Sequence, residues 1–135
     1  MKFENVEILR LGVKDNKDRI LSNPVFKESV PVLENSNPVH VHDFGSASNF
    51  KIVKGKTKED FDSVICDVLV FDKFTDKLKI FLEQGYSLHP FIVGEQVKTK
   101  EGFKTFEKFG VSGLFFDKLK LYADSKGLKD FEVKK

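Results

Sequence analysis

Lysine and phenylalanine are the residues whose spacing in this chain suggests binding chemistry. The sequence of 135 residues contains 15 phenylalanines and no tryptophan. The lysines include two short runs, one at Lys51, Lys54, Lys56 and Lys58 and the other at Lys98, Lys100 and Lys104. An ammonium group can neutralise a phosphate, and an aromatic ring offers a flat face for a nucleobase. The alternatives are ordinary solvated loops for the lysines, and core packing or a coding bias for the phenylalanines.

A second group with chemical potential is His40, His42 and Asp43. Two histidines at positions i and i+2 of a strand share a face and can bind one metal ion. The sequence offers no paired C-x-x-C and no second H-x-H, and His89 or Cys66 would complete a site only by coincidence of folding. We therefore expect a surface strand with two histidines, and neither a metal nor a cofactor.

Catalytic motifs are absent from the sequence. It has no phosphate-binding loop, no G-x-S-x-G elbow, no H-E-x-x-H pair and no dinucleotide-binding glycine pattern. The lone Cys66 lies among apolar residues, which is typical of a buried small side chain and not of a nucleophile. We therefore expect that the protein is not an enzyme.

The overall composition indicates a soluble globular domain. The chain is 40% hydrophobic and 33% charged, with a net charge of +2. That charge is lower than is usual for proteins that bind duplex DNA. No apolar run is long enough to span a membrane, and the first ten residues lack the apolar core of a signal peptide. We expect no membrane association and a cytoplasmic location.

The elements that must position these side chains are mostly strands. Alternating apolar residues predict strands near 6–13, 39–44, 49–54, 61–71, 88–93 and 114–122. Residues 97–100 and 103–111, on either side of Gly102, are predicted to form a hairpin. Apolar residues on both faces of 61–71 predict a central strand. Residues 22–38 contain three of the four prolines and read as an extended excursion in which Val30 and Val32 can pair as an edge strand. Residues 123–135 are a polar tail that we expect to be frayed or to form a short helix.

One helix is predicted over residues 73–84. Phe74, Leu78, Phe81 and Leu82 follow the spacing of a single apolar stripe. Asp72 is a good N-cap residue, and Gly85 suits the left-handed position that follows a helix.

The order of these elements resembles the bacterial single-stranded-DNA-binding protein (SSB) family and its phage relatives. The matching pieces are Val70-Phe71-Asp72-Lys73 at the end of a strand, Phe81-Leu82-Glu83-Gln84-Gly85 at the end of the helix, and Gly94 followed by Lys98-Thr99-Lys100. Together they cover about a quarter of the chain. The family's tryptophans and its acidic C-terminal tip are absent here, and the first 60 residues align poorly.

The resemblance implies an OB fold, which is an all-β five-stranded barrel with one helix between strands 3 and 4. It would occupy residues 1–122. The implied function is sequence-independent binding of single-stranded DNA in replication or recombination, by a homo-oligomer. The phage relatives imply a second expectation, a phage-encoded protein that acts in the host cytoplasm. The expected contacts are base stacking and phosphate binding by Phe50, Lys54, Lys56, Phe71, Lys98, Lys100 and Phe103. The alternative is a β-rich structural or protein-interaction module, such as a phage virion component or an inhibitor of a host protein.

Overall fold

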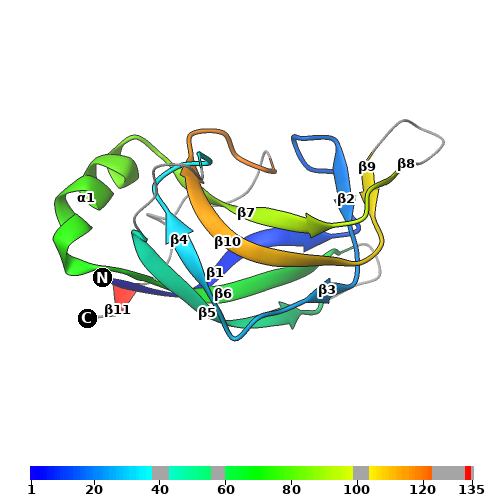
Figure 1. Cartoon of the computed structure of the whole chain (residues 1–135), viewed down its shortest axis with the longest axis horizontal. Coiled ribbons are helices and arrows are strands. Elements are labelled where there is room, and N and C mark those ends of the chain that lie inside the picture. Colours follow the sequence, from blue (N-terminus) through cyan, green and yellow to red (C-terminus); the bar gives the residue numbers. More distant parts are fainter. Residues whose placement is uncertain (38–42, 56–59, 99–103, 123–132, 135) are drawn as a thin grey trace.

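The chain folds into a curled, half-barrel sheet with one short helix at one end, as the computed structural model in Figure 1 shows. The structure describes residues 1–37, 43–55, 60–98, 104–122 and 133–134. Its helices are a 3-10 turn (η2, Asp72–Phe74) and α1 (Thr75–Glu83). Its strands are β1 (Lys2–Leu11), β2 (Arg19–Leu21), β3 (Pro24–Val25), β4 (Ser29–Leu33), β5 (Gly45–Val53), β6 (Asp62–Val70), β7 (Ser87–Gly94), β8 (Val97–Lys98), β9 (Lys104–Phe106), β10 (Phe109–Asp117) and β11 (Val133–Lys134).

The main sheet has eight strands in the order β11-β1-β6-β5-β4-β10-β3, and β7 also pairs with β10. Strands β4, β5 and β6 form an antiparallel meander that continues into β1. Strand β10 runs parallel to β4 and antiparallel to β7. Strands β1 and β7 approach each other without pairing, so the curled sheet has a seam between them. A small sheet of β2, β9 and β8 lies at the end away from the helix (Figure 1).

The prediction of a mostly β fold with one helix is confirmed, whereas the five-stranded barrel is not. One source of the difference is the proline-rich segment, which supplies β3 and β4 to the sheet and is not an excursion. Strand β4 lies between β5 and β10 and is therefore not an edge strand. Pro31 is tolerated there because the ladder with β10 begins only at Val32, so it does not require an N–H from Pro31.

The helix forms much as its sequence predicts. Leu78 and Phe81 are buried, and the partly buried Phe74 and Leu82 pack against the core. Gly85 has a φ of 75°, the left-handed conformation that ends a helix. Asp72 does not cap the helix as expected, because a 3-10 turn precedes α1 and Phe74 takes the cap position without a side-chain hydrogen bond.

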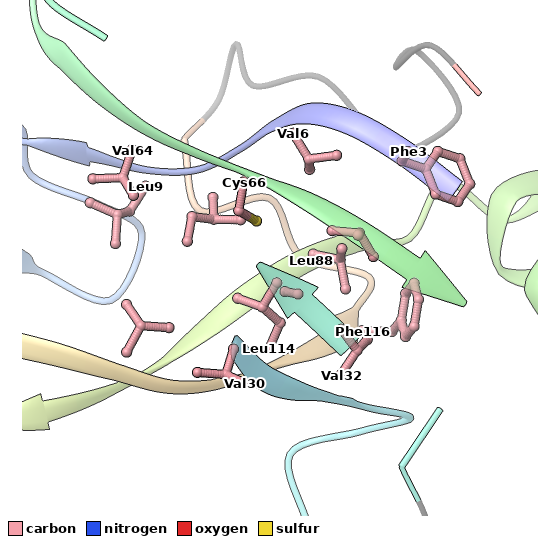
Figure 2. Close-up of a cluster of buried hydrophobic side chains, with 14 of the residues drawn as sticks. Phe3, Val6, Leu9, Val30, Val32, Val64, Cys66, Leu88, Leu114 and Phe116 are labelled. Carbon is pink, nitrogen blue, oxygen red and sulfur yellow. The ribbon is translucent and has the colours of Figure 1, made fainter. Parts of the chain in front are cut away.

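The core fills the concave side of the sheet. One face of β6 contributes Val64, Cys66, Val68 and Val70, each at most 1% exposed. Figure 2 shows Val64 and Cys66 with side chains of β1 on one side of the interior and Val30, Leu88 and Leu114 on the other. Strand β6 lies between β1 and β5, which confirms the predicted central strand, although Leu69 on its other face is 42% exposed. The predicted burial of the Cys66 side chain is confirmed.

Two left-handed asparagines bend the sheet on either side of β6. Asn5 in β1 and Asn49 in β5 have φ values of 55° and 57°, and the strand register shifts next to each. Asp67 of β6 accepts hydrogen bonds from the Asn5 backbone N–H at 3.1 Å and from Asn49 Nδ2 at 2.8 Å. These hydrogen bonds, the Asn49 bond foremost, lower the pKa of Asp67. One carboxylate therefore fixes two bulges, which increase the curl of the sheet.

Residues 118–122, here called the strap, cross the seam between β1 and β7. The Tyr122 hydroxyl accepts from the Arg10 backbone N–H at 2.9 Å and donates to the Arg10 carbonyl at 3.2 Å. The Leu119 carbonyl accepts from Ser87 Oγ and from His89 Nε2, both on β7. The sequence predicted a strand here, but β10 ends at Asp117. In place of a paired strand, the Tyr122 side chain of the strap hydrogen-bonds the Arg10 backbone groups at the edge of β1.

Candidate nucleic-acid interface

Two adjoining hollows lie at the end of the half-barrel opposite helix α1. Their volumes are about 590 and 520 Å³, and they share Val25 of β3 and Lys108. The first is also lined by Ile52 and the second by Val93. Together they form one concavity, the open-end hollow, with apolar walls and lysines at its margin. A concave site of this kind is the usual starting point for a binding hypothesis.

The bulge in β5 explains why apolar side chains reach this hollow. Ala47 faces the core, and the extra residue at Asn49 shifts the alternation of side chains by one position. Phe50 and Ile52 therefore take the inner face beyond the bulge. Phe50 packs against the core, while Ile52 lines the hollow and is 39% exposed.

Asp62 and Glu95 line the hollow as well as Lys27, Lys54 and Lys108, so its net charge is only slightly positive. The positive charge comes mainly from Lys27 and Lys108. Both are exposed, and neither has an ion-pair partner among the residues that the structure describes. Lys54 is different, because its Nζ lies 3.1 Å from Asp62 Oδ2. The Gly55 N–H and Lys54 lower the pKa of Asp62, so this carboxylate stays ionised and balances the charge of Lys54.

The other predicted lysines are only partly described. Lys98 lies in β8, which pairs antiparallel with β9 at the same end of the molecule. This pairing confirms the predicted hairpin. Lys56 and Lys100 fall outside the described residues. The segments next to them, at the end of β5 and the end of β8, border the open end.

The predicted aromatic residues do not form one group. Phe50 stacks on Phe26 with ring centroids 5.7 Å apart and is half-buried. Phe71 is 37% exposed but follows the last residue of β6, beside the helix. The nine residues of β6 separate it from Asp62 and Lys54 by roughly 30 Å. Phe103 lies outside the described residues.

Sequence reasoning missed the residues that line the hollow most directly. Val25 and Lys27 were assigned to an excursion, and Lys108 was not assigned to either lysine run. The only sequence signal was the short apolar pair Val25-Phe26 between Pro24 and Lys27, which fits many loops. Their proximity depends on the parallel pairing of β3 with β10, which no local pattern encodes.

Other candidate chemistry is not supported by the described part of the chain. Within it, no three His, Cys, Asp or Glu residues gather in a way that could hold a metal ion. His40 and His42 lie outside it. Burial raises the pKa of the Cys66 thiol, which therefore stays protonated and unreactive.

Comparison with known proteins does not assign the chain to a class. No protein-family model matches it, and neither a curated protein nor a solved structure is significantly similar. Within the described residues, no helix is long and apolar enough to cross a membrane.

Proposed function

We propose that this chain binds single-stranded DNA without sequence preference, through the open-end hollow. The observation that carries the proposal is the placement of Lys27 and Lys108, without ion-pair partners among the described residues, beside an apolar concavity. In this proposal the ammonium groups bind phosphates while Val25 and Val93 contact bases. A duplex keeps the faces of its bases stacked inside, so apolar walls of this kind favour a single strand.

An OB-type binding mode is the finer part of the proposal. In OB barrels the loops between strands flank the binding face. Here the described ends of two such connections line the open-end hollow, namely Lys54 and Asp62 at the ends of the connection from β5 to β6, and Glu95 and Lys108 at the ends of the connection from β7 to β10. We propose that Lys56, Lys98, Lys100 and Phe103 extend the site from these connections, with Phe103 supplying a stacking ring. A role in replication or recombination and a homo-oligomeric state are further parts of the proposal, and both rest on the resemblance to the SSB family.

A second candidate is a protein-docking surface, which a specific observation favours. Three of the exposed large apolar residues line the open-end hollow: Val25, Ile52 and Val93. All three are aliphatic, and without a flat ring they contact a base less extensively than an aromatic side chain does, whereas they pack well against a protein surface. An exposed apolar patch is a common mark of a protein interface.

One binding experiment separates the two candidates. Fluorescence anisotropy of a labelled oligo-dT of about 16 nucleotides is measured with the full chain at low and at high salt. Single-strand binding predicts saturable binding that weakens steeply as salt rises and is equal for oligo-dA. A docking surface for protein predicts no binding at either salt concentration, and that result would overturn the proposed function.

A further inference from the structure

A separate pocket of about 420 Å³ lies at the opposite end of the molecule, next to helix α1. Residues from four segments line it, including Asn35 after β4, Phe81 of α1, Tyr86 before β7, and Phe116 of β10 with Lys118 of the strap. None of these residues belongs to the open-end hollow. The nine residues of β10, which touches both sites, span roughly 27 Å.

The floor of this pocket is an aromatic stack with one accessible ring. Phe81 and Phe116 are 9% and 3% exposed, and their ring centroids lie 5.0 Å apart. The half-buried Tyr86 stacks on Phe81 with its centroid 4.6 Å away and an interplanar angle of 20°. Tyr86 is therefore held from behind by buried rings, and its position needs no reorganisation when a flat ligand stacks on it.

The polar groups at the margin are the donors of Asn35 and Lys118 and the carboxylates of Glu34 and Asp117. Asp117 already accepts from the Leu119 backbone N–H at 3.1 Å, and Lys118 is the lining cation that is available to an anion. Lys118 is exposed, its Nζ lies 5.8 Å from the Tyr86 ring centroid, and it has no ion pair within the described part of the chain. The Asn35 side-chain oxygen accepts from the Asn37 N–H at 2.8 Å, which turns the amide of Asn35 into a donor for other groups. The carboxylate of Glu34 is already paired with Lys77.

We propose that this helix-end pocket binds one nucleotide unit, with its base on the Tyr86 ring and a phosphate on Lys118. The flexible Lys118 side chain would leave the ring when a base arrives, and its ammonium group would then bind the phosphate beside that base. The chemistry is the same for a free mononucleotide and for a nucleotide within a single strand. Only the binding of a nucleotide within a single strand rests on the proposed function.

Tyrosine emission tests the pocket directly. The chain has two tyrosines and no tryptophan, and Tyr122 is only 6% exposed. A base that stacks on Tyr86 should therefore quench most of the ligand-sensitive emission. The full chain is titrated separately with dTMP and with oligo-dT of about 16 nucleotides.

Four variants assign the signal to the proposed contacts. Because both Tyr86 variants lack the tyrosine whose emission reports binding, their affinities are measured by anisotropy of labelled oligo-dT. Tyr86→Leu should weaken binding by roughly 5- to 150-fold, the usual loss for one stacked base, while Tyr86→Phe keeps the ring and the affinity but loses the quenching. Lys118→Ala should weaken binding without touching the buried stack, and Lys120→Ala is its control. Lys118→Ala therefore remains decisive if Tyr86→Leu folds poorly.

The outcomes separate this pocket from the proposed function. Quenching by oligo-dT supports a nucleotide of the bound strand, whereas quenching by dTMP without oligo-dT binding supports a free-nucleotide site and contradicts the proposed function. If oligo-dT binds but neither quenches emission nor responds to Lys118→Ala, the pocket proposal is overturned and the proposed function stands. An absence of quenching by either ligand also overturns it.

Discussion

Tyr122 illustrates how a single residue closes the edge of this sheet. Its hydroxyl bonds both the N–H and the carbonyl of Arg10, a pairing that a neighbouring strand would otherwise provide. The Arg10 guanidinium lies 4.9 Å from the Tyr122 ring centroid and 4.2 Å from that of Phe61. Burial raises the pKa of Tyr122 from 10.0 to about 12, so the phenol must stay protonated for the strap to remain in place.

Tyr122→Phe should lower the free energy of unfolding at pH 7 by about 1 to 3 kcal/mol, because the Arg10 backbone groups lose their partner. The pH dependence gives a sharper test. The unfolded tyrosine ionises near pH 10 and the folded one near 12. Between these two pH values the free energy of unfolding of the parent should therefore fall by up to about 1.4 kcal/mol per pH unit. Urea titrations should show that the free energy of unfolding of Tyr122→Phe decreases less over this pH range. An equal decrease in both proteins would contradict this account.

Residue types alone do not decide which side chains serve a site. The resemblance placed Phe71 and Lys54 on one binding surface, but a strand of nine residues separates them. Lys54 also carries a charge that Asp62 balances, whereas the unassigned Lys27 and Lys108 have no ion pair within the described residues. Burial of Cys66 could be predicted because it depends only on its apolar neighbours in the sequence. The ion pair between Lys54 and Asp62 could not be predicted, since it depends on the register of two strands.

At the scale of elements, helix α1 was the most predictable part of the chain. Its apolar stripe and terminal glycine are local signals, and both are confirmed. The side chain of Leu78, in α1, is fully buried. Leu78→Ala should therefore lower the free energy of unfolding by about 2 to 5 kcal/mol in chemical denaturation. Ile80, which is 51% exposed on the same helix, is the matched control, and Ile80→Ala should have a much smaller effect.

The strap gives a prediction for acid conditions. His89 of β7 is 1% exposed, and burial is the main reason that its pKa is lowered from 6.5. Its Nε2 donates to the Leu119 carbonyl, and Nδ1 has no partner among the described residues. As pH falls below about 6.5 the unfolded histidine gains a proton before the folded one does, so stability should decrease.

His89→Gln provides the comparison, because a glutamine amide can donate to the same carbonyl but does not titrate. The free energy of unfolding of this variant should depend less on pH between 6.5 and 5 than that of the parent. His40 and His42 are present in both proteins and do not affect the difference. Identical acid profiles would show that His89 is not held neutral by the fold.

For the whole molecule, the strand content was predictable and the strand order was not. Alternating residues identified β1, β6 and β7, because each strand shows its own pattern. The prolines of residues 22–38 favoured an excursion, yet β4 lies inside the sheet and β3 brings Val25 against β10. Parallel pairing between segments so distant in sequence leaves no local signal. The open-end hollow depends on that pairing and could not have been derived from the residues alone.

The most direct test of the proposed function is the salt dependence of oligo-dT binding after two lysines are removed from the hollow. Lys27→Ala combined with Lys108→Ala should flatten the slope of log K against log salt by about 1.4, which is about 0.7 for each lost phosphate contact. The control, Lys2→Ala with Lys79→Ala, removes the same charge from exposed positions outside the hollow and should leave the slope nearly unchanged. An equal change in both double variants would mean that net charge alone attracts the DNA, and an unchanged slope in the hollow variant would contradict phosphate binding at this site.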